Sequence, residues 1–261
     1  MNIDLTGKRA AVCGSTQGIG KATAFELARL GADIVLIARN QTVLESMANE
    51  LSVEKGQKHH FIAVDFAETG QLQRQINEYA SDHFVHILVN NTGGPPGGPA
   101  FEAKADEFIA AFANHLLCNQ ILTQALVPGM KAEGYGRIIN IISTSVKQPI
   151  NGLGVSNTIR GAVANWSKTL ANELGPFGVT VNNILPGATN TGRLQSIVET
   201  SAAKTGKPIE ETAELMKASI PARRFAEPTE LAYAIAFLAS PSAAYINGIN
   251  LPVDGGRTSC L

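Results

Sequence analysis

The chain of 261 residues is poor in charge and in long apolar runs. Its charged fraction is only 16%, its formal net charge is -1, and neither sign gathers into a run. The charge pattern that proteins use to bind nucleic acid or an anionic membrane surface is therefore missing, which favours small-molecule partners. No apolar stretch reaches the roughly 18 residues of a membrane span, so we expect no membrane association.

Cysteines and metal-type ligands are also sparse. The three cysteines, Cys13, Cys118 and Cys260, are odd in number and far apart, which argues against a disulfide framework. The first ten residues lack the basic and then apolar segments of a secretory signal. We therefore expect a cytoplasmic protein with reduced thiols. None of the five histidines pairs with another metal ligand at helical spacing on a convincing helix, so no metal site is expected.

Short β-rich runs alternate with longer amphipathic segments along the chain. Strands are predicted at 9–13, 33–38, 60–65, 86–91, 137–143, 179–185 and near 248–253. Helices are predicted at 18–30, 41–53, 69–82, 104–132, 154–174 and 228–239. The strand runs are nearly continuous in Val, Ile, Leu and Ala, as in parallel sheets covered on both faces. This predicts an α/β doubly wound Rossmann fold, with a parallel sheet of about seven strands and helices on both faces, in one domain over 1–261.

Residues 192–219 break this rhythm. The segment is helical in composition, contains Gly206 and Pro208, and stands where no strand is due, which is typical of an inserted substrate lid. It carries four cations and four glutamates, at Arg193, Lys204, Lys207, Lys217, Glu199, Glu210, Glu211 and Glu214. An acidic substrate and an ordinary surface helix both explain these charges.

A glycine-rich turn follows the first predicted strand and opens a predicted helix. Three glycines at the spacing G-x-x-x-G-x-G let the backbone turn sharply and approach a pyrophosphate that rests on a helix N-terminus. The strand before the turn and the helix after it are the context that supports this interpretation. The residues expected to hold a dinucleotide here are Gly14, Ser15, Gln17, Gly18, Ile19 and Gly20. The alternative is a tight turn without a ligand.

The end of the second predicted strand bears on the type of cofactor. A carboxylate there would accept the adenosine ribose hydroxyl of NAD. The chain has Ala38, Arg39 and Asn40 instead, so a guanidinium is available to pair with the 2′-phosphate of NADP. NADP(H) is therefore expected in preference to NAD(H), unless Arg39 is only a solvated charge at the strand end.

Further residues at the strand ends make a family resemblance specific. Asp65 follows the third predicted strand, Asn90-Asn91-Thr92-Gly93 the fourth, Ser143 ends the fifth, and Pro186-Gly187 follow the sixth. With the glycine-rich turn, these motifs resemble the short-chain dehydrogenase/reductase family over nearly the whole chain, from Gly7 to Gly256. The resemblance implies an NAD(P)(H)-dependent oxidoreductase that assembles as a homo-oligomer, either a dimer or a tetramer.

The same resemblance assigns cofactor contacts. Asp65 and Phe66 would flank the adenine, and Asn91 and Gly93 would steady the adenosine side. The residues implied for the nicotinamide are Pro186, Gly187 and Thr189. Arg160 is expected both to contact the cofactor and to take part in catalysis.

The chain departs from the family at the catalytic residues. The family has a tyrosine thirteen residues after the serine and a lysine four residues later, where this chain has Ser156 and Arg160. The family's catalytic asparagine maps to His115, or to Asn114 if the register shifts by one. Of the usual set only Ser143 remains.

The remaining groups can still stabilise negative charge on oxygen. Ser143 and Ser156 can donate hydrogen bonds, and Arg160 supplies a fixed positive charge, although neither group type readily releases a proton. His115 and Lys147 are candidate proton donors, and each has a plainer interpretation as a helix histidine or a loop cation. We therefore expect an atypical NADPH-dependent reductase of a carbonyl or an activated C=C bond. The alternative is a non-catalytic dinucleotide-binding sensor or scaffold.

Overall fold

Seven parallel strands form one sheet in the order β3-β2-β1-β4-β5-β6-β7. The computed structural model describes residues 1–260. The strands are β1 (Arg9–Cys13), β2 (Asp33–Ala38), β3 (His60–Ala63), β4 (Ile87–Asn90), β5 (Gly136–Ile141), β6 (Val179–Pro186) and β7 (Asn250–Val253). The strand order reverses between β1 and β4, as in a doubly wound sheet. The predicted fold class is confirmed.

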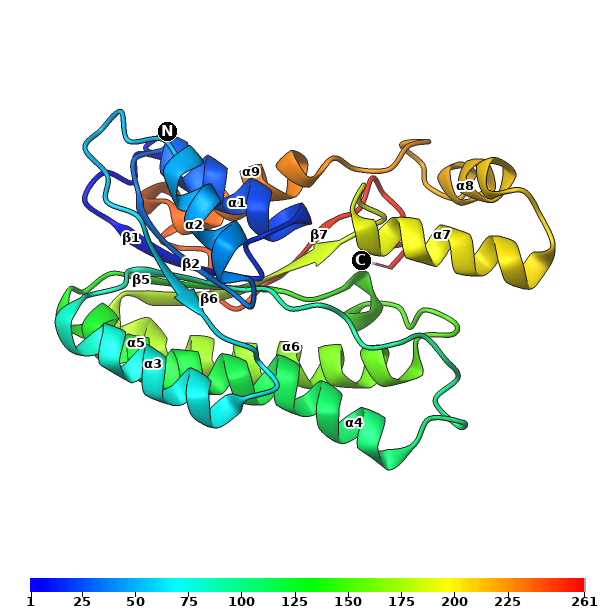
Figure 1. Cartoon of the computed structure of the whole chain (residues 1–261), viewed down its shortest axis with the longest axis horizontal. Helices are drawn as coiled ribbons and strands as arrows, with labels where there is room; N and C mark the ends of the chain where they lie inside the picture. Colours follow the sequence, from blue (N-terminus) through cyan, green and yellow to red (C-terminus); the bar gives the residue numbers. More distant parts are fainter. Residues whose placement is uncertain (261) are drawn as a thin grey trace.

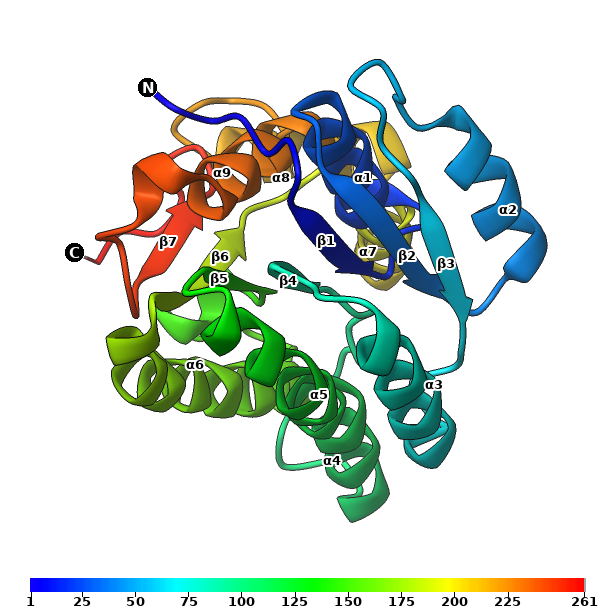
Figure 2. The same ribbon diagram turned by 90° about the vertical axis from the view of Figure 1, so that its left-hand side faces the viewer.

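Helices cover both faces of this sheet (Figures 1 and 2). One face carries α1 (Gly18–Arg29), α2 (Gln41–Glu50) and α9 (Pro228–Ala239). The other carries α3 (Thr69–Asp82), α5 (Cys118–Ala132) and α6 (Gly154–Leu174), and α4 (Ala105–Phe112) packs against α6. Among residues 1–260, no helix is both long and apolar enough to cross a membrane.

The core lies on both sides of the sheet. Along β1, Ala10 and Val12 pack into the core under α1 and α9, whereas Ala11 and Cys13 pack into the core over α3 and α5. Successive side chains of a strand point to opposite faces, so a strand covered on both faces must be apolar throughout. This is why the strand runs of the sequence do not alternate with polar residues.

The long helix predicted over 104–132 is interrupted. After α4, residues Ala113–Leu117 form a π-helical stretch before α5 begins at Cys118. A π-helical turn inserts an extra residue into the hydrogen-bonding pattern and rotates the side chains around it. His115 lies in this stretch and is only 2% exposed.

A ladder of buried asparagines crosses four strands. Asn90 donates to Asn140 at 2.8 Å, Asn140 donates to Asn183 at 3.0 Å, and Asn183 donates to Asn250 at 2.8 Å. These residues are register partners from β4 to β7. Because a buried amide without a partner is costly, the ladder opposes a shift of register among the strands from β4 to β7.

The segment at 192–219 forms two helices, α7 (Gly192–Thr205) and α8 (Ile209–Ala218), which extend beyond the strands (Figure 1). Gly206 closes α7 with φ of 69°, and Pro208 precedes α8. The break between the two helices thus falls where glycine permits the left-handed backbone and proline precedes the next helix. Leu194 and Val198 of α7 pack in a small apolar cluster with Ile220 and Phe225, which follow the segment.

Candidate functional site

The predicted site residues converge at the carboxyl edge of the sheet. The loops after β1, β4, β5 and β6 all leave the sheet at this edge, where the strand order reverses. Open α/β sheets bind ligands in the crevice at such a reversal. Two close approaches join these loops: a Cβ atom on Gly14 would lie 2.7 Å from the carbonyl oxygen of Asn91, and one on Gly18 would lie 3.0 Å from Thr191.

The turn after β1 has no room for side chains at its glycines. A Cβ atom on Gly20 would collide with the carbonyl oxygen of Gly14, and Gly18 has φ of 53°. Gln17 gives α1 no side-chain cap, and the first turn of α1 contains no acidic residue. The first N–H groups of α1 are thus left for an anion, and the turn fits the diphosphate of a dinucleotide.

Of the residues predicted for the adenosine side, Asn91 holds this turn in place. Asn91 donates from Nδ2 to the carbonyl oxygens of Cys13 and Gly14, at 3.3 Å each, and so ties the end of β4 to the turn. Asp65 accepts a hydrogen bond from the backbone of Ala67 at 3.0 Å, whereas Phe66 packs against the core beneath the sheet. Gly93 is exposed and has open space where a Cβ atom would stand. Ser15 is buried, and its hydroxyl lies 3.5 Å from the carbonyl oxygen of Ile37.

Arg39 lies at the end of β2 with its side chain 78% exposed. Its Nη1 atom is 3.7 Å from Oδ2 of Asp65. An exposed ion pair of this kind is worth only about 0–1 kcal/mol. The guanidinium can therefore exchange this partner for a phosphate group at little cost.

The end of β6 packs closely against the last strand. A Cβ atom on Gly187 would lie 2.6 Å from Cα of Asp254, and the Gly187 N–H donates to the carbonyl oxygen of Val253 at 3.0 Å. Thr189 is buried and donates from its hydroxyl to the carbonyl oxygen of Gly187 at 3.1 Å. Pro186, Gly187 and Thr189 thus belong to a connection between β6 and α7 that hydrogen bonds and close packing hold in place.

His115 is held by Thr92, a residue of the motif after β4 to which the sequence alone assigned no role. Its Nδ1 atom forms a short hydrogen bond with the hydroxyl of Thr92, in the loop after β4. Burial, with a contribution from the positive charge of Arg160, lowers the pKa of His115 to about 3. The imidazole is therefore neutral near pH 7 and has no imidazolium proton to give. Its Nε2 atom forms no hydrogen bond with residues 1–260.

Arg160 is a buried cation on α6, 8% exposed, four residues after Ser156 and thus on the same helix face. Its Nη1 atom donates to the carbonyl oxygen of Ile141 at 2.9 Å, and no carboxylate of residues 1–260 pairs with it. Burial, and to a lesser extent the charge of Arg193, lowers the pKa of Arg160 to about 10, so the guanidinium stays charged near pH 7. An isolated buried charge is costly, which makes this residue a strong functional candidate.

The two serines are free to donate. Ser143 lies two residues beyond the end of β5, and its hydroxyl oxygen accepts a hydrogen bond from the backbone of Ser145 at 3.1 Å. The hydroxyl of Ser156 forms no hydrogen bond with residues 1–260. Lys147, the last of the predicted catalytic residues, is exposed and ends a short 3₁₀ turn over Thr144–Val146.

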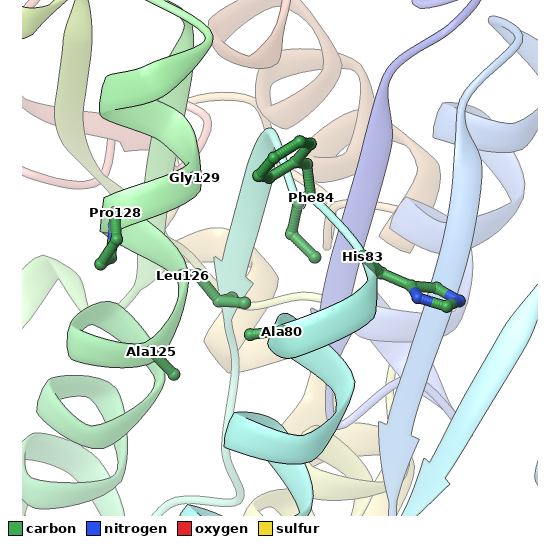
Figure 3. Close-up of a pocket in the computed structure, with 8 residues that line it drawn as sticks. Ala80, His83, Phe84, Ala125, Leu126, Pro128 and Gly129 are labelled. Atoms are coloured by element: carbon green, nitrogen blue, oxygen red, sulfur yellow. The ribbon is translucent and has the colours of Figure 1, made fainter.

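A hollow of about 240 Å³ lies elsewhere, between the C-terminal end of α3 and α5 (Figure 3). It is lined by Ala80, His83, Phe84, Val85, Ala125, Leu126, Pro128 and Gly129. These residues precede β4 or face its start, so the hollow is at the opposite edge of the sheet from the glycine-rich turn. Among residues 1–260, the His, Cys, Asp and Glu side chains form no group of three that could hold a metal ion.

Known proteins share both the sequence pattern and the fold. A family model described as enoyl-(acyl carrier protein) reductase matches residues 14–258. The 3-oxoacyl-(acyl-carrier-protein) reductase FabG of Vibrio cholerae is 34% identical over 258 residues, which span 97% of this chain and 98% of that protein.

Solved structures agree with this match. L-sorbose reductase from Gluconobacter frateurii, complexed with NADPH and L-sorbose, is similar with a TM-score of 0.93 and 32% identity over 100% of both chains. YwfH, an NADPH-dependent reductase involved in bacilysin biosynthesis, is similar with a TM-score of 0.91 and 28% identity, over 97% of this chain and 99% of that one. The chain therefore belongs to the short-chain dehydrogenase/reductase family.

Proposed function

We propose that this protein is an NADP(H)-dependent reductase with an altered donor set, acting on the carbonyl or activated C=C bond of a small molecule. The observation that carries the proposal is the cluster at the carboxyl edge of the sheet. There the buried cation Arg160 is grouped with the neutral His115 and with Ser156, and within residues 1–260 Arg160 has no carboxylate partner and the Ser156 hydroxyl forms no hydrogen bond. The relatives support it, since the L-sorbose reductase structure contains NADPH and YwfH is described as NADPH-dependent.

The residues at the strand ends fit such a cofactor. The turn from Gly14 to Gly20 would receive the diphosphate, Arg39 the 2′-phosphate, and Asp65 and Phe66 the adenine. Asn91 and Gly93 would hold the adenosine side. The nicotinamide side would contact Pro186, Gly187, Thr189 and Arg160. When bound, NADPH would supply the hydride.

The protein itself would stabilise the oxygen that gains negative charge. Ser143 and Ser156 would donate hydrogen bonds to this oxygen, and His115 would add a third from Nε2. Arg160 would supply a fixed positive charge. Preorganised donors of this kind are each worth roughly 10²–10³ in rate.

The donor set is better suited to holding an oxyanion than to protonating it, because hydroxyl and guanidinium groups are very weak acids. The hydride step of enone conjugate reduction requires only that the oxyanion be stabilised, because its immediate product is an enolate. Carbonyl reduction also needs a proton, for which we propose Lys147 as the source. We therefore retain both reactions in the proposal.

Two further features belong to the proposal. We assign 1–261 to one dinucleotide-binding domain in which the segment 192–219 acts as a lid that excludes water from the reaction. We also propose a homo-oligomer, because the helical face that includes Ile109, Phe112 and Leu117 leaves large apolar side chains exposed.

The direct test of function is NADPH oxidation, followed by absorbance, with ketones, quinones and enones. We expect turnover of at least one class, and we expect Ser143→Ala to lower it by roughly 10²–10³-fold while NADPH binding is kept. Equal rates in the wild type and the variant would indicate chemistry outside this site. NADPH binding without turnover of any class would favour the non-catalytic sensor or scaffold.

The cofactor preference depends on Arg39. We expect Arg39→Ala to weaken NADPH binding by about tenfold to a hundredfold and to leave NADH binding unchanged, because hydrogen bonds to charged groups are worth about 1.5–3 kcal/mol. Fluorescence titration of both cofactors measures this. The matched control is Lys55→Ala, which removes another exposed cation from an ion pair, with Asp4, at the opposite edge of the sheet. Equal weakening of NADPH and NADH by Arg39→Ala would contradict the assignment.

A further inference from the structure

Arg193 links the lid to the rest of the site. It lies in the first turn of α7, and its Nη2 atom donates to the carbonyl oxygen of Pro95 at 2.8 Å, across 98 residues of sequence. Its guanidinium comes within 3.6 Å of the position that a Cβ atom would take on Gly94. The side chain therefore reaches from α7 to the loop after β4, which is the loop that begins with the Thr92 partner of His115.

Two other cations of the lid form ion pairs with glutamates of the lid. Lys207 pairs with Glu211 at 2.6 Å, and Lys217 pairs with Glu214 at 2.8 Å. Arg193 pairs with no carboxylate of residues 1–260. In the sequence alone, the four glutamates of the segment balance its four positive charges. In the structure, none of these glutamates neutralises the charge of Arg193.

A second uncompensated arginine lies within electrostatic reach. The positive charge of Arg193 acts on Arg160, which is buried, forms one hydrogen bond, and has no carboxylate partner among residues 1–260. Two like charges destabilise each other, and burial of one of them adds a desolvation cost. Both side chains lie near the loop after β4, since Arg193 bonds to Pro95 and Arg160 acts on His115, the partner of Thr92. An anion bound between them would relieve both costs.

We propose that Arg160 and Arg193 together bind a carboxylate of the substrate, so that the reduced carbonyl or C=C bond belongs to an organic acid. The inference rests on the proposed function and names the substrate class for that site. Guanidinium groups match the planar carboxylate and bind it through paired, charge-assisted hydrogen bonds. Because Arg193 belongs to α7, a bound acid would also hold the lid against the loop after β4.

One other anion could use the same chemistry. The N-terminal end of α7 is near the glycine-rich turn, since Thr191 would be 3.0 Å from a Cβ atom on Gly18. The cofactor diphosphate is therefore a second possible partner for Arg193. The experiment separates the two by measuring cofactor binding and acid binding independently.

The test uses matched pairs of 2-oxo acids and enone carboxylic acids with their uncharged methyl esters. We measure the Tm of the full-length protein with and without NADPH, and the Kd of each compound, for the wild type, Arg193→Gln and the control Lys207→Gln. We expect the wild type to bind the acid of the matching pair at least about tenfold more tightly than its ester. Arg193→Gln should abolish this preference without changing the Kd for NADPH, whereas Lys207→Gln should keep it.

Two results would overturn the proposal. One is equal binding of acids and esters by the wild type. The other is a loss of NADPH affinity in Arg193→Gln with the acid preference intact, which would assign Arg193 to the cofactor diphosphate. If NADPH does not bind at all, the proposed function fails. The acid and ester comparison on the protein without cofactor still decides the present inference.

Discussion

Replacing Arg160 by methionine is expected to lower kcat/KM by roughly 10²–10³-fold without lowering the Tm. The guanidinium is buried, forms one hydrogen bond with Ile141, and pairs with no carboxylate of residues 1–260. An isolated buried charge is costly, so its exchange for an apolar side chain of similar volume, with the loss of only one hydrogen bond, should leave the stability unchanged or higher. The variant should therefore lose kcat/KM while its Tm is kept. Loss of an arginine with only a structural role would instead lower the Tm.

The matched control is Arg137→Met, on β5. Arg137 is 3% exposed and donates to the carbonyl oxygens of Gly136, Gly178 and Ser240, at 2.8, 3.3 and 3.4 Å. Its guanidinium also stacks 4.1 Å from the centre of the Tyr135 ring. This variant should lose Tm and retain kcat/KM in the fraction that stays folded. If Arg160→Met behaved in the same way, the catalytic role assigned to Arg160 would be wrong.

Replacing His115 by leucine is expected to lower kcat by roughly 10²-fold and to change the stability of the protein in acid. In the unfolded chain the imidazole has its ordinary pKa of 6.5, whereas in the fold its pKa is about 3. Below pH 6.5 the unfolded state therefore binds a proton that the folded state does not. The wild type should lose about 1.4 kcal/mol of stability per pH unit from this group as the pH falls below 6.5, and the variant should not.

Thermal unfolding from pH 7 downwards checks this, because the other titrating groups are common to both proteins and cancel in the difference. Thr92→Val provides the second arm. A threonine hydroxyl that donates to Nδ1 leaves the imidazole proton on Nε2, so loss of this hydroxyl should lower kcat while KM is largely kept. Parallel acid profiles for the wild type and His115→Leu would show that His115 is not held neutral by its burial.

The parts of the fold that depend on local sequence were predictable. The residues that cause a local element lie close together in the sequence. This holds for the near-continuous apolar strands, the amphipathic helices and the turn from Gly14 to Gly20. The break at Gly206 and Pro208 was not predicted, although it also has a local cause, since glycine permits the left-handed backbone and proline cannot continue a helix.

The contacts that give the site its character are long-range. The hydrogen bond between Thr92 and His115 depends on the π-helical stretch that interrupts the predicted helix over 104–132. The reach of Arg193 to Pro95 and the asparagine ladder from β4 to β7 depend on how distant segments pack. Residue types at these positions were visible in the sequence, but their pairing was not.

The substitutions also make sense as a group. Arg160 occupies the position where the resemblance places a lysine, and its charge helps to keep His115 neutral. Thr92 then fixes the ring of that histidine. A change at one of these positions alters the electrostatic environment of the others. We therefore expect that the effects of single reversions toward the family pattern on kcat/KM will not add when the reversions are combined.

The most direct measurement of the central claim is a fluorescence titration of the wild-type protein with NADPH and with NADH. We expect saturable binding of both cofactors at one site per chain, with NADPH bound more tightly. If neither NADPH nor NADH bound saturably, the dinucleotide site at the glycine-rich turn would be contradicted, and with it the reductase function proposed for this protein.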